Sequence, residues 1–311
     1  MNLQPQISII MATYNRAHFI EETLLSIKNQ TYTHWVCLII DDGGTDNTKN
    51  VIKPLLLEDS RFQYHKRPVT YKKGLPGSRN YGLDLAKGDY IIFFDDDDII
   101  HPQNLNYCIE ALQKVQVDFC HYQKQSFENN LPEIESDKLE VNRRLSINDI
   151  EVIVTGAYAL ASCTVLWKKD CFHNIRFNET LMYAEEWECY TNIILHGFKG
   201  ISLKNTLYYN RKHSVSNTGQ FWKKNPIHIA SKKKALVLVA KNLEKKNYLT
   251  ISIQKYILGL AISYRDLKLL KNLLEIINRS KLFKTTMLVK YYLFSLWRIL
   301  YKIKIALLNN N

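Results

Sequence analysis

The sequence predicts an α/β protein whose mostly parallel sheet is flanked by helices and followed by a basic, all-helical C-terminal region. Short apolar segments alternate with segments of helical periodicity four times within the first 100 residues. Such alternation predicts parallel strands joined by right-handed crossovers. Residues 220–311 hold 19 Lys and Arg against 3 acids, whereas residues 1–219 hold 23 against 27. The change of charge predicts a boundary near Gly219, between a region 1–219 and a helical region 220–311.

The expected elements follow from apolar runs and from the breakers beside them. Short runs rich in β-branched and aromatic residues predict buried strands, and apolar residues near helical spacing predict helices. The expected strands are 7–13, 35–40, 61–65, 90–94, 117–124, 158–167 and 198–208. The expected helices are 17–29, 46–57, 77–86, 102–115 and 184–196. The stretch 128–150 is polar, and we expect it to be a variable segment outside this alternation of strands and helices.

Composition narrows the class of protein. With 46% hydrophobic residues among 311, the chain can bury a substantial core. Its six cysteines show no CxxC spacing, so we expect reduced thiols in a cytosolic protein and neither a zinc site nor a disulfide framework. The first residues lack the pattern of a signal peptide, and no run of about 18 uncharged apolar residues predicts a membrane span.

Four consecutive carboxylates, Asp95 to Asp98, follow the apolar run 90–94 directly. Their mutual repulsion and desolvation require a nearby cation or an opening to water. Because side chains two apart in an extended segment point the same way, Asp95 and Asp97 can converge on one ion. Oxygen ligands of this kind suit Mg²⁺ or Mn²⁺ that carries a substrate's phosphates. The alternative is an acidic turn that caps a helix starting near Pro102, and we expect this role for Asp98.

Four motifs together carry a family resemblance. In order along the chain they are ISIIMATYNR, LIIDDGGTDNT, GLPGSRNYGLDLAKGDYIIFFDDDD and YAEEWECY. Over roughly residues 5–215 the chain resembles the family 2 glycosyltransferases of GT-A fold. The resemblance implies an inverting, metal-dependent hexosyltransferase that moves a sugar from a nucleotide-sugar donor, usually UDP-linked, to an acceptor hydroxyl.

The resemblance also assigns residues to the donor nucleotide. Thr13 and Tyr14 would line the base pocket, and Asp42 would accept a hydrogen bond from the uracil imide. Arg79 would reach base or phosphate oxygens, and Asp96 would lean toward the ribose hydroxyls. The alternatives are an ordinary turn at Tyr14 and a surface salt bridge at Arg79.

Asp95 and Asp97 match the DxD positions of the family, and the resemblance implies Mn²⁺ or Mg²⁺ bridging both donor phosphates. The ion would neutralise charge on the departing nucleoside diphosphate. Arg211 and His213 resemble a loop that folds over the diphosphate, with His213 a further metal ligand or a phosphate contact. A histidine in a loop can also have neither role.

Glu185 and Glu186 stand where the family has a Glu-Asp pair at the start of a helix. Glu186 aligns with the catalytic base that deprotonates the acceptor, although the substitution of Glu for Asp leaves open which glutamate acts. A neighbouring carboxylate would raise the pKa of one of them. Both could instead simply favour the positive end of a helix dipole. The motif DDGGT also departs from the usual DDGST, with Gly44 in place of Ser.

The final segment, 284–308, predicts a helix with a wide apolar face. Lys290, Arg298 and Lys302 share one stripe, with Ser295 beside it. This pattern suits a helix that lies in a membrane interface, and upstream lysine clusters would add attraction to anionic lipid. The alternative is a helix packed on the catalytic region. No nucleic-acid-binding motif accompanies the basic charge, so we expect no nucleic-acid partner.

The sequence therefore predicts a cytoplasmic glycosyltransferase, peripheral at the inner face of a bacterial membrane, that builds a surface polysaccharide or a lipid-linked glycan. Two alternatives stay open. One is another metal-dependent phosphoryl or nucleotidyl transferase, because acidic clusters at sheet ends also serve that chemistry. The other is a non-catalytic protein that binds nucleotide-sugars.

Overall fold

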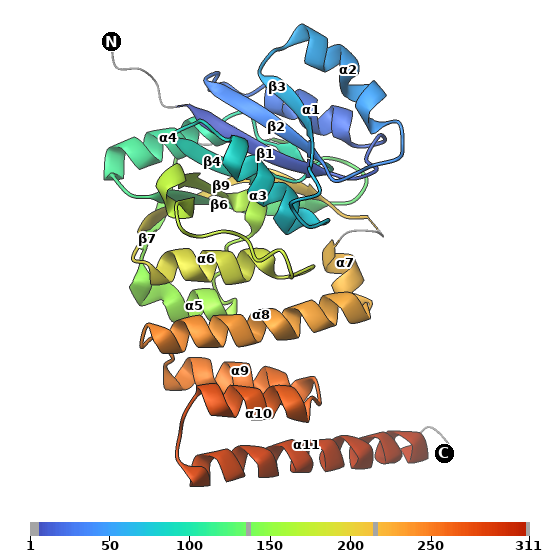
Figure 1. Cartoon of the computed structure of the whole chain (residues 1–311), viewed down its shortest axis with the longest axis vertical. Helices are drawn as coiled ribbons and strands as arrows, with labels where there is room; N and C mark the ends of the chain where they lie inside the picture. Colours follow the sequence, from blue (N-terminus) through green and yellow to red (C-terminus); the bar gives the residue numbers. More distant parts are fainter. Residues whose placement is uncertain (1–5, 135–137, 214–216, 309–311) are drawn as a thin grey trace.

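The computed structural model describes residues 6–134, 138–213 and 217–308, with side chains described outside 214–218 and 295–311. A nine-stranded sheet forms one end of the molecule, and helices stack away from it toward the C-terminus (Figure 1). The strands are β1 (Ile7–Thr13), β2 (Trp35–Asp41), β3 (Phe62–Lys66), β4 (Tyr90–Phe94), β5 (Ile99–Ile100), β6 (Phe119–Phe127), β7 (Val141–Leu145), β8 (Val165–Lys168) and β9 (Gly200–Arg211).

Helices follow the strands in the order that the sequence predicts. They are α1 (Ile20–Lys28), α2 (Thr48–Glu58), α3 (Leu75–Leu85), α4 (Asn104–Val115), α5 (Ile150–Thr155), α6 (Glu185–Leu195), α7 (Asn217–Trp222), α8 (Pro226–Lys245), α9 (Ile251–Ser263), α10 (Leu267–Ile276) and α11 (Lys281–Leu308). Short 3₁₀ turns cover Ile147–Asp149, Ser162–Thr164 and Lys169–Phe172.

The strand order β3-β2-β1-β4-β8-β6-β9-β5 places the predicted functional motifs at one edge of the sheet. Strands β3, β2, β1 and β4 are parallel, and Thr13 of β1 pairs with Asp41 of β2 while Met11 pairs with Phe94 of β4. The ends of β1, β2 and β4 therefore meet, as the carboxyl ends of parallel strands must. The prediction of an α/β fold with a mostly parallel sheet is confirmed.

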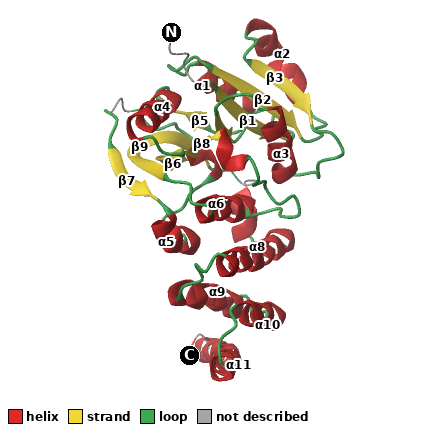
Figure 2. Ribbon diagram, turned by 60° about the vertical axis from the view of Figure 1, so that its left-hand side comes forward, coloured by secondary structure: helices red, strands yellow, loops and turns green. Residues whose placement is uncertain are grey.

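The central strands are buried because both faces of the sheet are covered. Ile9 and Met11 of β1 pack on the side that holds α1, α2 and α4, and Ile10 packs on the opposite side. This is the alternation expected of a strand between two helical layers. Figure 2 shows helices on either side of the twisted sheet.

The C-terminal region is helical, as predicted; α9 and α10 lie side by side beneath α8, and α11 lies beneath them (Figures 1 and 2). The hydrophobic core that contains Phe93 of β4 continues through Trp167 of β8 and Ile193 of α6 to Leu236 of α8 and Leu270 of α10. The helical region is thus packed on the sheet region through α6 and α8. The division at residue 219 stays a prediction.

Two elements differ from their predicted form. The expected strand 158–167 is a 3₁₀ turn followed by the short strand β8, since only Val165 to Lys168 finds sheet partners, in β4 and β6. The polar stretch 128–150 contributes β7, which pairs with β9 and buries only Leu145; residues 135–137 lie outside the described part.

In the tail, α11 extends the predicted helix by three residues at its start, and Lys290 lies on it. The side chains of Ser295, Arg298 and Lys302 lie outside the described part, so their shared stripe stays a prediction. Within the described residues no helix combines the length and the apolar character needed to cross a bilayer.

Candidate active site

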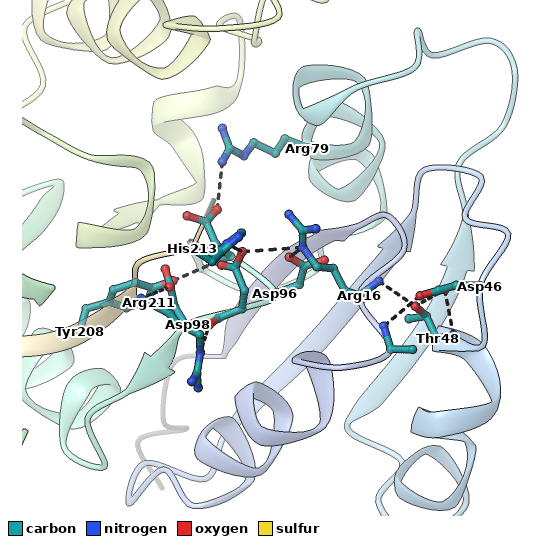
Figure 3. A network of polar contacts seen from close by, with 12 residues as sticks. Arg16, Asp46, Thr48, Arg79, Asp96, Asp98, Tyr208, Arg211 and His213 are labelled. Atoms are coloured by element: carbon teal, nitrogen blue, oxygen red, sulfur yellow. Dashed lines mark hydrogen bonds and ion pairs between the residues drawn. The ribbon is translucent and has the colours of Figure 1, made fainter. Parts of the chain in front are cut away.

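A pocket of about 190 Å³ opens at the carboxyl end of β4. All four residues of the acidic run line it, together with predicted site residues from α3, α6 and the end of β9: Arg79, Glu185, Glu186, Arg211 and His213. Side chains from segments more than 100 residues apart in the sequence therefore face one space. Figure 3 shows the polar contacts that hold part of this cluster.

Cations surround the acidic run, as its charge requires. Arg16 Nε lies 3.2 Å from Asp96 Oδ1 and 3.7 Å from Asp97 Oδ2. Arg79 Nη2 lies 3.4 Å from Asp95 Oδ1, and the Arg211 backbone N–H donates to Asp98 Oδ1 at 2.7 Å. Arg16, which the sequence analysis did not single out, is the cation nearest to Asp96.

Even with these partners the pocket favours more positive charge. Burial, reinforced by the Asp97 charge, raises the pKa of Asp96 to about 7, although Arg16 opposes the shift. Burial also raises the pKa of Asp95 and that of Asp98. Carboxylates with raised pKa values are those whose charge is incompletely compensated. A divalent cation would supply the missing compensation.

The possible metal ligands form two adjoining groups. His213 Nε2 lies 2.8 Å from Asp97 Oδ2, which brings together two of the three predicted ligands. Asp95, the third, is grouped instead with Asp98 and Cys163, whose ligand atoms lie within 4.8 Å of one another. Oxygen donors dominate the set, which fits Mn²⁺ or Mg²⁺.

The role predicted for Asp98 as a helix cap is wrong. Helix α4 begins at Asn104 with Gln103 in the cap position, and Asp98 is 2% exposed. Asp98 faces inward because β5 follows it at once and pairs with β9, which directs the Arg211 amide at its carboxylate.

Cys163 is a site residue that the sequence did not reveal. It reaches the pocket because the 3₁₀ turn Ser162–Thr164 precedes β8, the neighbour of β4 in the sheet. All six cysteines are free and buried, and Cys163 is distinguished by its position beside Asp95 and Asp98.

The residues predicted for the base pocket lie beside this pocket, at the ends of β1 and β2. Tyr14 is 43% exposed, and Lys73 Nζ lies 4.4 Å from the centre of its ring. Thr13 is buried. None of Thr13, Tyr14 and Asp42 lines the 190 Å³ pocket. Their assignment to the nucleotide stays a prediction.

Asp42 organises the loop before α3. It accepts hydrogen bonds from the Gly74 amide at 2.9 and 3.1 Å and from Ser78 Oγ at 3.2 Å, and it pairs with Arg67 Nε. Its neighbour Asp41 accepts from Tyr64 Oη at 2.7 Å. Arg67 and Ser78 were not singled out, because nothing in their local sequence marks these contacts.

The two adjacent glutamates have different surroundings. Glu185 is buried, and its Oε1 lies 2.8 Å from Arg79 Nη1. Burial and the neighbouring Glu186 charge raise the pKa of Glu185 to about 8, against the effect of Arg79. Glu186, by contrast, lines both the acidic pocket and a second pocket of about 240 Å³ between α5, α6, α8 and α9. The structure thus separates a paired glutamate from one that faces two cavities.

Comparisons with known proteins give a family match and relatives of known name. Residues 8–169 match the sequence model of Glycosyl transferase family 2. A Campylobacter jejuni protein named GalNAc(5)-diNAcBac-PP-undecaprenol beta-1,3-glucosyltransferase is 31% identical over 193 residues, 61% of this chain and 60% of that protein. This chain therefore spans about three fifths of that relative.

A second relative is matched over more of its length. The Escherichia coli protein WfaP, named a UDP-Glc:alpha-D-GlcNAc-diphosphoundecaprenol beta-1,3-glucosyltransferase, is 31% identical over 211 residues. The match covers 68% of this chain and 78% of WfaP.

Solved structures share the fold. Staphylococcus aureus TarS 1–349 in complex with UDP superposes with a TM-score of 0.66 and 16% identity, covering 88% of this chain and 81% of that 1–349 chain. A Pyrobaculum calidifontis mannosyltransferase in complex with GDP-Man and Mn²⁺ superposes with a TM-score of 0.59 and 15% identity, covering 95% and 81%.

Proposed function

Because the chain belongs to glycosyl transferase family 2, we propose that it transfers a hexose from a UDP-sugar, UDP-glucose first among them, to a hydroxyl of a lipid-linked glycan. Two relatives carry an undecaprenol-linked acceptor in their names, and WfaP carries UDP-Glc. The observation that carries the proposal is a single pocket that joins the acidic run after β4 to Glu186 of α6.

The acidic run would receive the donor's diphosphate through a divalent cation. Asp97 and His213 would hold Mn²⁺ or Mg²⁺, with Asp95 and Asp98 beside them. Once bound, the ion would neutralise the charge that grows on the departing UDP. Arg211, whose Nε donates to the Asp97 carbonyl oxygen at 3.1 Å, lies at the same edge as a further cation for the phosphates.

Glu186 would take the proton from the acceptor hydroxyl. The hydroxyl oxygen then forms a bond to the anomeric carbon as the bond from that carbon to the UDP oxygen breaks, with inversion of configuration. Glu185 is a positioning residue in this scheme, since its carboxylate is already engaged by Arg79. Glu186, which makes no ion pair among the described side chains, would then be the one general base of a single displacement.

The nucleotide would extend from the diphosphate toward β1 and β2. Tyr14 offers an exposed ring on which a uracil can stack, and Lys73 borders that ring. Asp42 and Thr13 lie behind it at the ends of the two strands. Asp96, close to Arg16, would lie on the ribose side.

The C-terminal helices would bring the enzyme to the cytoplasmic face of the membrane. Leu282, Val289, Tyr292 and Leu293 are exposed on α11, which starts at Lys281. An exposed apolar surface on a helix in a strongly basic region is typical of attachment to anionic lipid.

A hydrolysis assay tests the proposal. The protein is incubated with Mn²⁺ and a panel of nucleotide-sugars, and the products are separated. Release of UDP and free sugar supports a glycosyltransferase. Release of pyrophosphate or of a nucleoside monophosphate would support a nucleotidyl or phosphoryl transferase instead, and binding without turnover even with acceptor present would support a non-catalytic protein.

A further inference from the structure

The second pocket shares a wall with the donor pocket. Ala161, Tyr183 and Glu186 line both, so the carboxylate assigned as the base stands at their boundary. In an inverting displacement the acceptor approaches from the side opposite the leaving diphosphate. With the diphosphate at the acidic run, the second pocket is the space from which a hydroxyl would reach Glu186.

The remaining walls come from α5 and the loop after it, from α6, and from the C-terminal helices α8 and α9. Helix α6 supplies Trp187 and Tyr190, whereas α8 supplies Lys232 and α9 supplies Tyr256. The Trp187 indole is held in place because its Nε1–H donates to the Val154 carbonyl oxygen at 3.2 Å. A cavity with aromatic walls and a few polar groups is typical of a small-ligand site.

Lys232 and Glu186 are the two charged groups of this pocket, and among the described side chains neither makes an ion pair. The Lys232 Nζ lies 3.7 Å from the centre of the Trp187 ring, and among the described side chains no carboxylate oxygen comes within 4.0 Å of it. The next residue, Lys233, is paired with Asp266 at 2.8 Å. Burial lowers the pKa of Lys232 to about 8, against the effect of the Glu186 charge.

A half-buried ammonium without a counterion is costly, and an anionic ligand would remove that cost. The contact with Trp187 offsets only part of it, since the attraction between a cation and an aromatic ring is small compared with the cost of burying a charge. Aromatic walls favour contact with a sugar ring, and Glu186 must lie near an acceptor hydroxyl, so the same space should also hold a sugar. The ligand should therefore be a sugar that carries a negative group.

We propose that the second pocket binds the acceptor and that Lys232 of α8 binds an anionic substituent of it, namely the phosphoryl group that links the acceptor sugar to its lipid. This inference rests on the proposed function. It adds the charge that the acceptor must carry and the residue that selects it. A carboxylate on the acceptor sugar would present the same chemistry, and the experiment separates the two sources.

The inference is tested with three acceptor probes that carry the same undecyl chain. They are an N-acetylglucosaminyl diphosphate, a neutral N-acetylglucosaminide, and a glucuronide whose carboxylate is on the sugar. Binding is measured by calorimetry with UDP and Mn²⁺ present, and transfer is measured with UDP-glucose. The variants are Lys232→Met, Lys232→Arg and the control Lys234→Met, which removes an exposed lysine of the same helix.

The wild type should bind the diphosphate probe at least 10-fold more tightly than the neutral one. Lys232→Met should abolish that preference, chiefly through KM, whereas Lys232→Arg should keep most of it and Lys234→Met all of it. Preference for the glucuronide alone would place the anion on the sugar and still support Lys232 as its partner. Equal binding of all three probes, or equal losses in the Lys232→Met and Lys234→Met variants, would overturn the inference. Hydrolysis of UDP-glucose by the wild type tests the proposed function separately.

Discussion

Arg79 Nη1 lies 2.8 Å from Glu185 Oε1, and the two side chains are 4% and 5% exposed. This buried contact occupies the first glutamate of the pair, whereas the second, Glu186, lies at the boundary of the two pockets. The sequence left the choice between them open, and the structure supplies a physical reason to prefer Glu186 as the base.

Glu186→Gln should lower kcat for transfer by roughly 10²- to 10⁴-fold, the range expected when a general base is removed. The dissociation constant of UDP should stay within about 2-fold, because the amide keeps the size of the side chain. Single-turnover transfer and calorimetry with UDP measure the two effects. A Glu185→Gln variant that folds normally and yet loses as much kcat would contradict the assignment.

Asp97→Asn should weaken the contribution of Mn²⁺ to UDP binding by at least about 10-fold, since an amide is a poorer ligand than a carboxylate. His213→Asn should act in the same direction, because His213 Nε2 lies 2.8 Å from Asp97. Calorimetric titration with UDP in Mn²⁺ and in EDTA isolates the effect of the metal. The control Asp84→Asn removes a partly exposed partner of Arg176 outside the pocket. Equal metal dependence in all the variants would rule out this ligand set.

The stability of the protein should depend on pH through Glu185. Its pKa is raised from 4.5 to about 8, chiefly by burial, so the folded state binds its proton more tightly than the unfolded state does. The stabilisation is complete below about pH 4.5 and is lost as the pH rises through about 8. The free energy of unfolding of the wild type, relative to that of Glu185→Gln, should therefore fall between these values. Urea denaturation across the range measures it, with the exposed Glu58→Gln as control; parallel curves for wild type and Glu185→Gln would refute it.

Gly77→Ala should destabilise the protein and weaken donor binding together. An added Cβ would lie 1.9 Å from the carbonyl oxygen of Lys72, so the loop that brings the Gly74 amide to Asp42 must move. Overpacking of this kind costs about 1–3 kcal/mol. Gly259→Ala is the matched control, because a Cβ added at this position meets no atom within 4 Å. Since Gly259 lies in the interior of α9, this substitution should stabilise the helix by roughly 0.5–1 kcal/mol. Thermal denaturation and UDP titration check both, and an unchanged UDP affinity in Gly77→Ala would show that the loop does not support the donor site.

The sequence predicted best the elements that are determined by neighbouring residues in the chain. The runs 7–13, 35–40 and 90–94 are apolar and bounded by polar residues, and each became a buried strand. Because these strands are parallel neighbours, the acidic run after β4 lies at the sheet edge where ligands bind.

Contacts between residues far apart in the sequence could not be predicted in this way. Asp98 looked like a helix cap because a proline follows it closely, yet the pairing of β5 with β9 turns it inward. Arg16 lies 80 residues from Asp96, and Cys163 lies 65 or more from the carboxylates it accompanies. No periodicity or local motif records such approaches.

The second pocket is built jointly by α6 and by the C-terminal helices α8 and α9. One side of it belongs to α6, next to the base, while Lys232 and Tyr256 come from α8 and α9; all three helices lie beyond residues 8–169, which match the family. Exchange of α8 and α9 between homologues would then redirect the enzyme to a new acceptor and leave the choice of nucleotide-sugar as it was. Recombination at this junction would in that case vary the acceptor while the donor pocket stays intact.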